Sequence, residues 1–89
     1  MNPQNGYDVE DITVGMSAEI AKTITDADIL LFSAVSTDTN AVHIDEEFGR
    51  TTMFGGRIAH GMLSASLISA VLGNRLPGPG TIYMSQSLR

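Results

Sequence analysis

The chain has 89 residues, which is enough for at most one domain with a single small core. Hydrophobic residues make up 43% of it and charged residues 17%, a composition typical of a folded chain rather than a disordered one. The net charge of −5 argues against a nucleic-acid surface, and the absence of cysteine excludes disulfide scaffolds, thiolate nucleophiles and cysteine zinc sites.

The first 15 residues are predicted to form an irregular lead-in, because Pro3, Gly6 and Gly15 interrupt them. Acidic residues stand where a signal peptide would carry basic ones, and no apolar run in the chain approaches ~18 residues. We therefore expect a cytoplasmic protein that does not enter a membrane.

The next elements are a strand and a helix. Residues 17–25 alternate apolar and polar side chains, which predicts a β-strand with one buried face. Thr25 is followed three residues later by Asp28, the spacing of a capping box, so a helix is predicted to begin there. This helix is predicted to end near Ser36 or Thr37.

A loop and a short helical turn are predicted between this helix and a longer helix further along the chain. The polar segment 37–45 predicts a loop, and a short helical turn is predicted over 46–52. Gly55 and Gly56 then break the chain.

A long helix is predicted from Ile58 to Asn74, and its surface is apolar or small on every side. Such a helix is buried and needs a sheet wrapped about it. After a tight LPGPG loop, β-branched and aromatic residues favour a second strand over 81–89. Two strands and one helix cannot close a core, so we predict a single domain over residues 1–89 that lacks its last strands.

Asp38 and His43 lie five residues apart across a turn-rich segment that contains Asn40. A carboxylate and an imidazole that converge in this way can hold and activate a water molecule, and such proton transfer contributes roughly 10²–10⁴ in rate. On spacing alone, a purely structural interpretation is the more common one for such residues. In that case Asp38 and Asn40 cap a helix end, and His43 is an ordinary loop histidine.

Gly61 follows His60 at the start of the long helix, where backbone N–H groups lack partners within the helix. A thioester oxygen could be held on the Gly61 N–H, because a residue without Cβ lets a ligand approach closely. The alternative is that Gly61 serves helix packing and His60 caps the helix. His43, Asp45 and His60 do not share a rigid element, so we predict no metal site.

The order of motifs resembles a known family. Asp-x-Asn-x-x-His-x-Asp is followed by Phe-Gly-x-x-Ile-Ala-His-Gly-Met-Leu and then by Leu-Pro-Gly-x-Gly-Thr-Ile-Tyr, over most of residues 25–88. This order is similar to that of the MaoC-like (R)-specific enoyl-CoA hydratases. The resemblance implies an α+β hot-dog fold, in which a curved antiparallel sheet wraps a long central helix, and a homodimer. It also implies hydration of trans-2-enoyl-CoA to (R)-3-hydroxyacyl-CoA, in fatty-acid or polyhydroxyalkanoate metabolism.

Carried onto this sequence, the resemblance implies that Asp38 and His43 are the catalytic dyad. They would position and deprotonate the water and protonate the α-carbon of the substrate. The Gly61 N–H would hold the thioester oxygen. The resemblance implies no metal and no cofactor, because the substrate itself carries coenzyme A.

Substrate-binding roles would fall to Asn40, which supports the dyad, and to Ser69 and Leu72, which face the acyl chain. The family usually has proline where this sequence has Ala41, so the loop before His43 loses a fixed φ. The chain also ends at Arg89, short of strands that the family uses for its core, dimer contact and CoA site.

Two other functions stay open on the sequence. One is a non-catalytic hot-dog subunit that binds acyl-CoA or regulates a partner. The other is a dehydratase or thioesterase on the same fold. Hot-dog thioesterases generally carry a carboxylate on the central helix, and residues 59–72 contain no Asp or Glu, which counts against a thioesterase.

Overall fold

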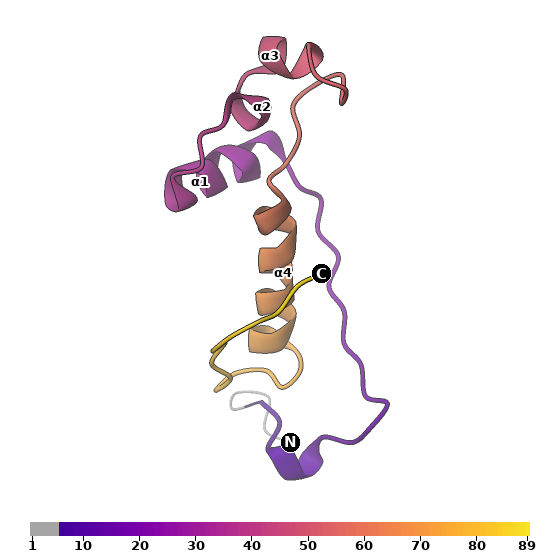
Figure 1. Cartoon of the computed structure of the whole chain (residues 1–89). Helices are drawn as coiled ribbons and strands as arrows, with labels where there is room; N and C mark the ends of the chain where they lie inside the picture. The colour runs from indigo at the N-terminus through magenta and orange to yellow at the C-terminus, as the bar shows by residue number, and fades with distance from the viewer. Residues whose placement is uncertain (1–5) are drawn as a thin grey trace. The chain divides into compact units, whose positions relative to one another are not determined.

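The computed structural model describes residues 6–89, and the regular elements among them are helical (Figure 1). The described residues fall into two compact units, one formed by 22–65 and the other by 6–21 with 66–89. The elements in chain order are the 3-10 helix η1 (Val9–Asp11) and the α-helices α1 (Asp26–Ser36), α2 (Ala41–Ile44), α3 (Glu46–Arg50) and α4 (Gly61–Asn74).

Helix α1 confirms the predicted capping box. The Thr25 hydroxyl accepts a hydrogen bond from the Asp28 N–H at 3.2 Å, and the Asp28 carboxylate accepts one from the Thr25 N–H at 2.9 Å. The helix ends at Ser36 as predicted, because Thr37 adopts a left-handed conformation with φ 63°.

The predicted loop over 37–45 contains a helical turn, α2, that the prediction missed. Asn40 caps it, since its side-chain oxygen accepts from the Val42 N–H at 3.2 Å. Helix α3 lies within the predicted turn over 46–52, and Asp45 caps it by accepting from the N–H groups of Glu47 and Phe48. Within the unit 22–65, α2 packs against both α1 and α3.

Helix α4 begins at Gly61 and not at Ile58 as predicted. The residues before Gly61 form hydrogen bonds with α2 instead of continuing the helix. The Ile58 N–H donates to the Val42 carbonyl at 3.1 Å, and the Ile58 carbonyl accepts from the His43 ring at 2.8 Å. A residue whose backbone is used in this way cannot also join the helix. The consequence is that residues 57–60 run beside α2.

The Arg57 side chain and a close backbone contact at Gly49 hold this segment. The Arg57 guanidinium pairs with Asp26 at 3.0 Å and with Glu46 at 3.4 Å, and it donates to the Ile44 carbonyl at 3.3 Å. Gly49 is buried against the backbone of Gly56 and Arg57, where a Cβ would lie 2.5 Å from the Gly56 carbonyl carbon. Only glycine fits such a close approach of two backbones.

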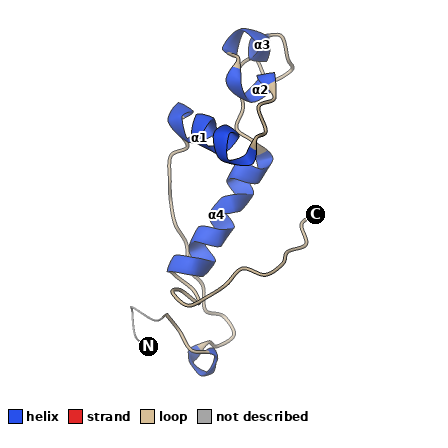
Figure 2. Ribbon diagram, turned by 90° about the vertical axis from the view of Figure 1, so that its left-hand side faces the viewer, coloured by secondary structure: helices blue, strands red, loops and turns tan. Residues whose placement is uncertain are grey.

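The two predicted strands, over 17–25 and 81–89, are wrong for this structure. Both segments are extended coil, and Figure 2 shows no strand among residues 6–89. A β-strand needs a neighbouring strand for its backbone hydrogen bonds, and neither segment has one within the described part of the chain. The expected sheet is therefore not among these elements.

The expected burial of α4 is also not seen. Leu63 is the buried residue of this helix, whereas Met62 and Ile68 are 55% and 46% exposed. The apolar surface of α4 has no covering layer among residues 6–89, which explains the difference from the prediction.

Part of the lead-in predicted over 1–15 lies outside the described residues, and its described part contains η1. None of the helices in the described chain has the length and apolar character needed to cross a membrane.

Candidate active site

His43 is a buried side chain of the short helix α2, with 9% of its surface exposed. Its Nδ1 lies 2.8 Å from the Ile58 carbonyl oxygen. A carbonyl can only accept a hydrogen bond, so Nδ1 carries the proton and donates it. In the neutral ring Nε2 then has the free lone pair, which is the arrangement that a general base needs.

Asp38 is exposed and lies in the turn that leaves α1. Its backbone N–H donates to the Ser36 hydroxyl at 3.1 Å, and its carboxylate accepts from the Asn40 N–H at 3.3 Å. The left-handed Thr37 reverses the chain just before it. These local bonds fix the turn and direct the carboxylate away from the helix.

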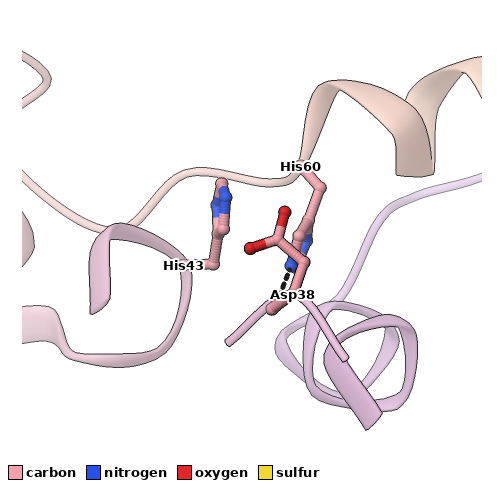
Figure 3. Close-up of side chains that lie close together, drawn as sticks. All are labelled: Asp38, His43 and His60. Carbon is pink, nitrogen blue, oxygen red and sulfur yellow. Dashed lines mark hydrogen bonds between the residues drawn. The ribbon is translucent and has the colours of Figure 1, made fainter. Parts of the chain in front are cut away.

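The structure brings Asp38 and His43 together, as the sequence predicted for a convergent pair. One carboxylate oxygen of Asp38 and one ring nitrogen from each of His43 and His60 all lie within 4.8 Å of one another (Figure 3). One water molecule can bridge two polar atoms at this separation, because each hydrogen bond spans about 2.8 Å.

His60 is the third member of this cluster; the sequence interpretation considered it as a helix cap and, with His43 and Asp45, as a metal ligand. Its carbonyl does cap α4, since it accepts from the Leu63 N–H at 3.1 Å and the Ser64 N–H at 3.4 Å. The residue is 2% exposed. The ring stacks on that of His43, with centroids 3.8 Å apart and planes at 25°, and it meets the Phe32 ring edge at 4.9 Å.

The His60 ring also reaches two oxygens. Its Nε2 lies 2.9 Å from the Asp38 backbone carbonyl and 3.0 Å from the hydroxyl of the buried Ser33 on α1. A polar Ser33 one helical turn after the buried Ile29 is a signal that could have indicated a polar partner in this core.

Gly61 is exposed and is the first residue of α4. An N–H group at this position has no acceptor within the helix and lies at the positive end of the helix dipole. Apart from its chain neighbours and its own helix backbone, a Cβ built on Gly61 would meet no atom within 4 Å, so the space at this position is open. A side chain at this position would take up space that glycine leaves free for a ligand.

The three residues expected to bind substrate belong to different units of the chain, Asn40 to the unit 22–65 and Ser69 and Leu72 to the other. Asn40 lies beside Asp38 and bonds its carboxylate through the backbone. Ser69 is exposed on α4, and Leu72 lines an open pocket of about 200 Å³ with residues 81–85, within the unit that contains 66–89. These positions add no contact that assigns a role to Ser69 or Leu72.

The three clustered side chains carry atoms that metal ions bind, but their geometry suits a water better. Two rings stacked 3.8 Å apart at 25° hold their in-plane lone pairs in separate, nearly parallel planes, so both lone pairs cannot point at one ion about 2 Å from each nitrogen. Asp45, also considered as a ligand, is used as the cap of α3.

Comparison with known proteins identifies the relatives of this chain. The (R)-specific enoyl-CoA hydratase of Rhodospirillum rubrum is 61% identical over 80 residues, which cover 90% of this chain and 56% of that protein. The unliganded R-hydratase PhaJ1 of Pseudomonas aeruginosa matches with a TM-score of 0.85 and 52% identity, over 90% of this chain and 52% of its own.

A second solved structure, the (R)-hydratase of Aeromonas caviae involved in PHA biosynthesis, matches with a TM-score of 0.84 and 44% identity. It is covered over 60% of its length, so the chain spans a little over half of the relatives that it matches. These matches confirm the expected likeness to hot-dog hydratases. A model of the MaoC like domain matches residues 10–89, and the chain belongs to this family.

Proposed function

We propose that this chain carries the catalytic residues of an (R)-specific enoyl-CoA hydratase, which adds water to trans-2-enoyl-CoA to give (R)-3-hydroxyacyl-CoA. The observation that carries the proposal is the close approach of the Asp38 carboxylate to the ring of His43, with their polar atoms within 4.8 Å. The backbone N–H of Gly61, at the start of α4 and with free space at the Cβ position, would supply the third group that this reaction needs.

In the proposed reaction a water molecule is held between the Asp38 carboxylate and Nε2 of His43. The dyad takes one proton from the water as its oxygen bonds to C3 of the enoyl group. The electron pair of the double bond moves to form an enolate, whose oxygen is stabilised by the Gly61 N–H. The dyad then returns a proton to C2, so one water is consumed and the protein is unchanged.

The proposed setting for this site is a single hot-dog domain that acts as a homodimer. In that fold α4 would be the central helix, and the extended segments 17–25 and 81–89 would pair with further strands of a curved antiparallel sheet. The exposed apolar residues Met62 and Ile68 on α4 support a covering layer. Fatty-acid or polyhydroxyalkanoate metabolism is the pathway that this function would serve.

Of the open alternatives, the binding subunit and the thioesterase fit the structure less well. A non-catalytic acyl-CoA-binding subunit would be favoured if Asp38 and His43 were too far apart to share a water, and they are not. A thioesterase of this fold would place a carboxylate on the central helix, but α4 has none. A dehydratase uses the same dyad in the reverse direction, because hydration and dehydration pass through the same enolate and the same transition states.

The direct test is hydration of crotonyl-CoA, followed by the loss of enoyl-thioester absorbance. The parent chain should be active, and Asp38→Asn should lose roughly 10²–10⁴ in rate. The matched control is Glu47→Gln, an exposed carboxylate that pairs with Arg50 on α3 and should keep the parent rate. A folded parent without hydration activity would reject the hydratase function and favour the binding subunit.

A further inference from the structure

The His60 ring contacts both residues of the proposed dyad. It hydrogen-bonds the backbone of Asp38 and stacks on the side chain of His43. It is almost fully buried, whereas the Asp38 side chain that it helps to place is exposed. A buried ring of this kind does not reach substrate, but it can determine where the two reactive groups stand.

The hydrogen bonds define which nitrogen of His60 carries its proton. Nε2 lies 2.9 Å from the Asp38 carbonyl, which can only accept, so Nε2 must be the donor. The Ser33 hydroxyl at 3.0 Å then accepts from the same N–H. Nδ1 is buried and has no hydrogen-bond partner among residues 6–89.

The opposite tautomer would be unfavourable on both sides of the ring. A proton on Nδ1 would be a buried donor without an acceptor, and the lone pair on Nε2 would face the lone pairs of the Asp38 carbonyl. His60 therefore holds the turn that carries Asp38 through a single directed N–H.

The stacked rings give His60 its second contact. The His43 ring is fixed on one edge by the Ile58 carbonyl and on one face by His60. Phe32 of α1 meets His60 edge-on, so the His60 ring is itself held in place by α1 through Phe32 and Ser33. The orientation of His43 thus depends on the packing of His60.

We propose that His60 is a positioning residue of the site: its Nε2–H anchors the Asp38 turn while its ring supports the face of His43, so that the carboxylate and the imidazole share one water. This inference rests on the proposed hydratase function for its catalytic consequence. The contacts themselves can be tested without activity.

The kinetic test compares His60→Gln with His60→Leu. The side-chain amide of Gln can place an N–H near the position of Nε2, whereas Leu fills the space without a donor. His60→Leu should lower kcat about 10–100-fold with KM nearly unchanged, because a small misplacement of reacting groups is costly and His60 does not touch substrate. His60→Gln should recover a large part of that loss.

If His60 served packing alone, His60→Leu would have a higher kcat than His60→Gln, because an apolar Leu suits a buried site better than Gln does. Equal or greater kcat for His60→Leu would therefore overturn the proposal. Circular dichroism establishes that each variant folds. Should both variants unfold, Ser33→Ala is the milder test, because it removes one acceptor of the His60 N–H. It should lower kcat about 2–5-fold with KM unchanged. An unchanged kcat would overturn the proposal.

A second measurement separates this inference from the hydratase function. In a long-range ¹H–¹⁵N spectrum above neutral pH, His60 should be the Nε2–H tautomer and His43 the Nδ1–H tautomer, and His60→Gln should change the tautomer ratio of His43. This pattern in an inactive parent would support the positioning role and reject the hydratase. An Nδ1–H tautomer at His60 would overturn the positioning role, whether or not the parent hydrates crotonyl-CoA.

Discussion

The ring of His43 donates a hydrogen bond through Nδ1 to the carbonyl of Ile58, fifteen residues later in the chain, at 2.8 Å. This bond both ties α2 to the segment before α4 and leaves Nε2 as the free base. The two roles can be separated by His43→Asn, because the Asn amide can keep the bond to Ile58 but cannot take a proton.

We predict that His43→Asn lowers the kcat of crotonyl-CoA hydration by roughly 10²–10⁴-fold and leaves the thermal unfolding midpoint close to that of the parent. Absorbance kinetics and a circular dichroism melt measure the two quantities. A variant that hydrates at the parent rate would remove His43 from the mechanism.

Gly61→Ala tests the open N–H at the start of α4. Apart from its chain neighbours and its own helix backbone, a methyl group at this position meets no atom within 4 Å, so the fold should accept it. It would instead occupy the space that the thioester oxygen enters, and we expect kcat/KM to fall about 10–100-fold.

Gly73→Ala is the matched control on the same helix, since its Cβ also meets nothing within 4 Å and Gly73 lies outside the proposed site. It should keep the parent rate and gain up to ~1 kcal/mol in stability. An equal loss of activity in both variants would assign the effect to α4 as a whole.

How well the sequence predicted each element depended on how local its signals were. Thr25 and Asp28 define the start of α1 by contacts within one turn, and this start was predicted to the residue. The start of α4 was missed because Ile58 uses its backbone to bond Val42 and His43, and a pattern of helix-forming residues cannot reveal such partners. The strands failed for the same reason, since their partners are not local.

In the candidate site, too, the contacts between residues close in sequence were predicted and those between distant residues were not. Asp38 and His43 were predicted to converge because only a short turn separates them, and the structure places them within reach of one water. The part played by the His60 ring depends on Ser33 and Phe32, which are more than 25 residues away in sequence. No spacing within the motif that contains His60 carries that information.

Ala41→Pro is predicted to stabilise the turn before His43. Ala41 is the first residue of α2, where a missing N–H costs nothing, and Asn40 already has φ −53° and ψ 133°, which a following proline favours. The free energy of unfolding should rise by about 0.4–1 kcal/mol, because the unfolded chain loses freedom.

Urea unfolding measures this change. The control is Ala34→Pro, which lies inside α1 and should cost about 3 kcal/mol or more. Destabilisation by Ala41→Pro would mean that the Ala41 N–H has an acceptor in the folded chain.

Gly49→Ala is predicted to destabilise the unit 22–65. The added Cβ would lie 2.5 Å from the Gly56 carbonyl carbon and 2.6 Å from the Arg57 nitrogen, so two backbone segments would have to separate. Overpacking of this kind costs about 1–3 kcal/mol. Gly56→Ala is a milder comparison, because its Cβ would meet the movable end of the Glu46 side chain at 3.0 Å. Equal stability of the two variants in urea would contradict the close backbone contact.

The capping box of α1 predicts a loss of stability in acid. The backbone N–H of Thr25, and then the Lys22 ammonium at 2.9 Å, hold the pKa of the Asp28 carboxyl below its ordinary value. A pKa that is lower in the folded chain than in the unfolded chain stabilises the fold above the unfolded value, and this contribution disappears as the pH falls through the folded value.

The difference in stability between the parent and Asp28→Asn should therefore be largest near neutral pH and should shrink below about pH 4. Urea unfolding at the two pH values measures it. Glu47→Gln, which removes an exposed carboxylate of α3, serves as the control and should leave the pH dependence of the parent in place. A difference between parent and Asp28→Asn that stays constant down to pH 3 would show that the Asp28 charge does not contribute to the cap, and that the helix start depends on the Thr25 hydroxyl alone.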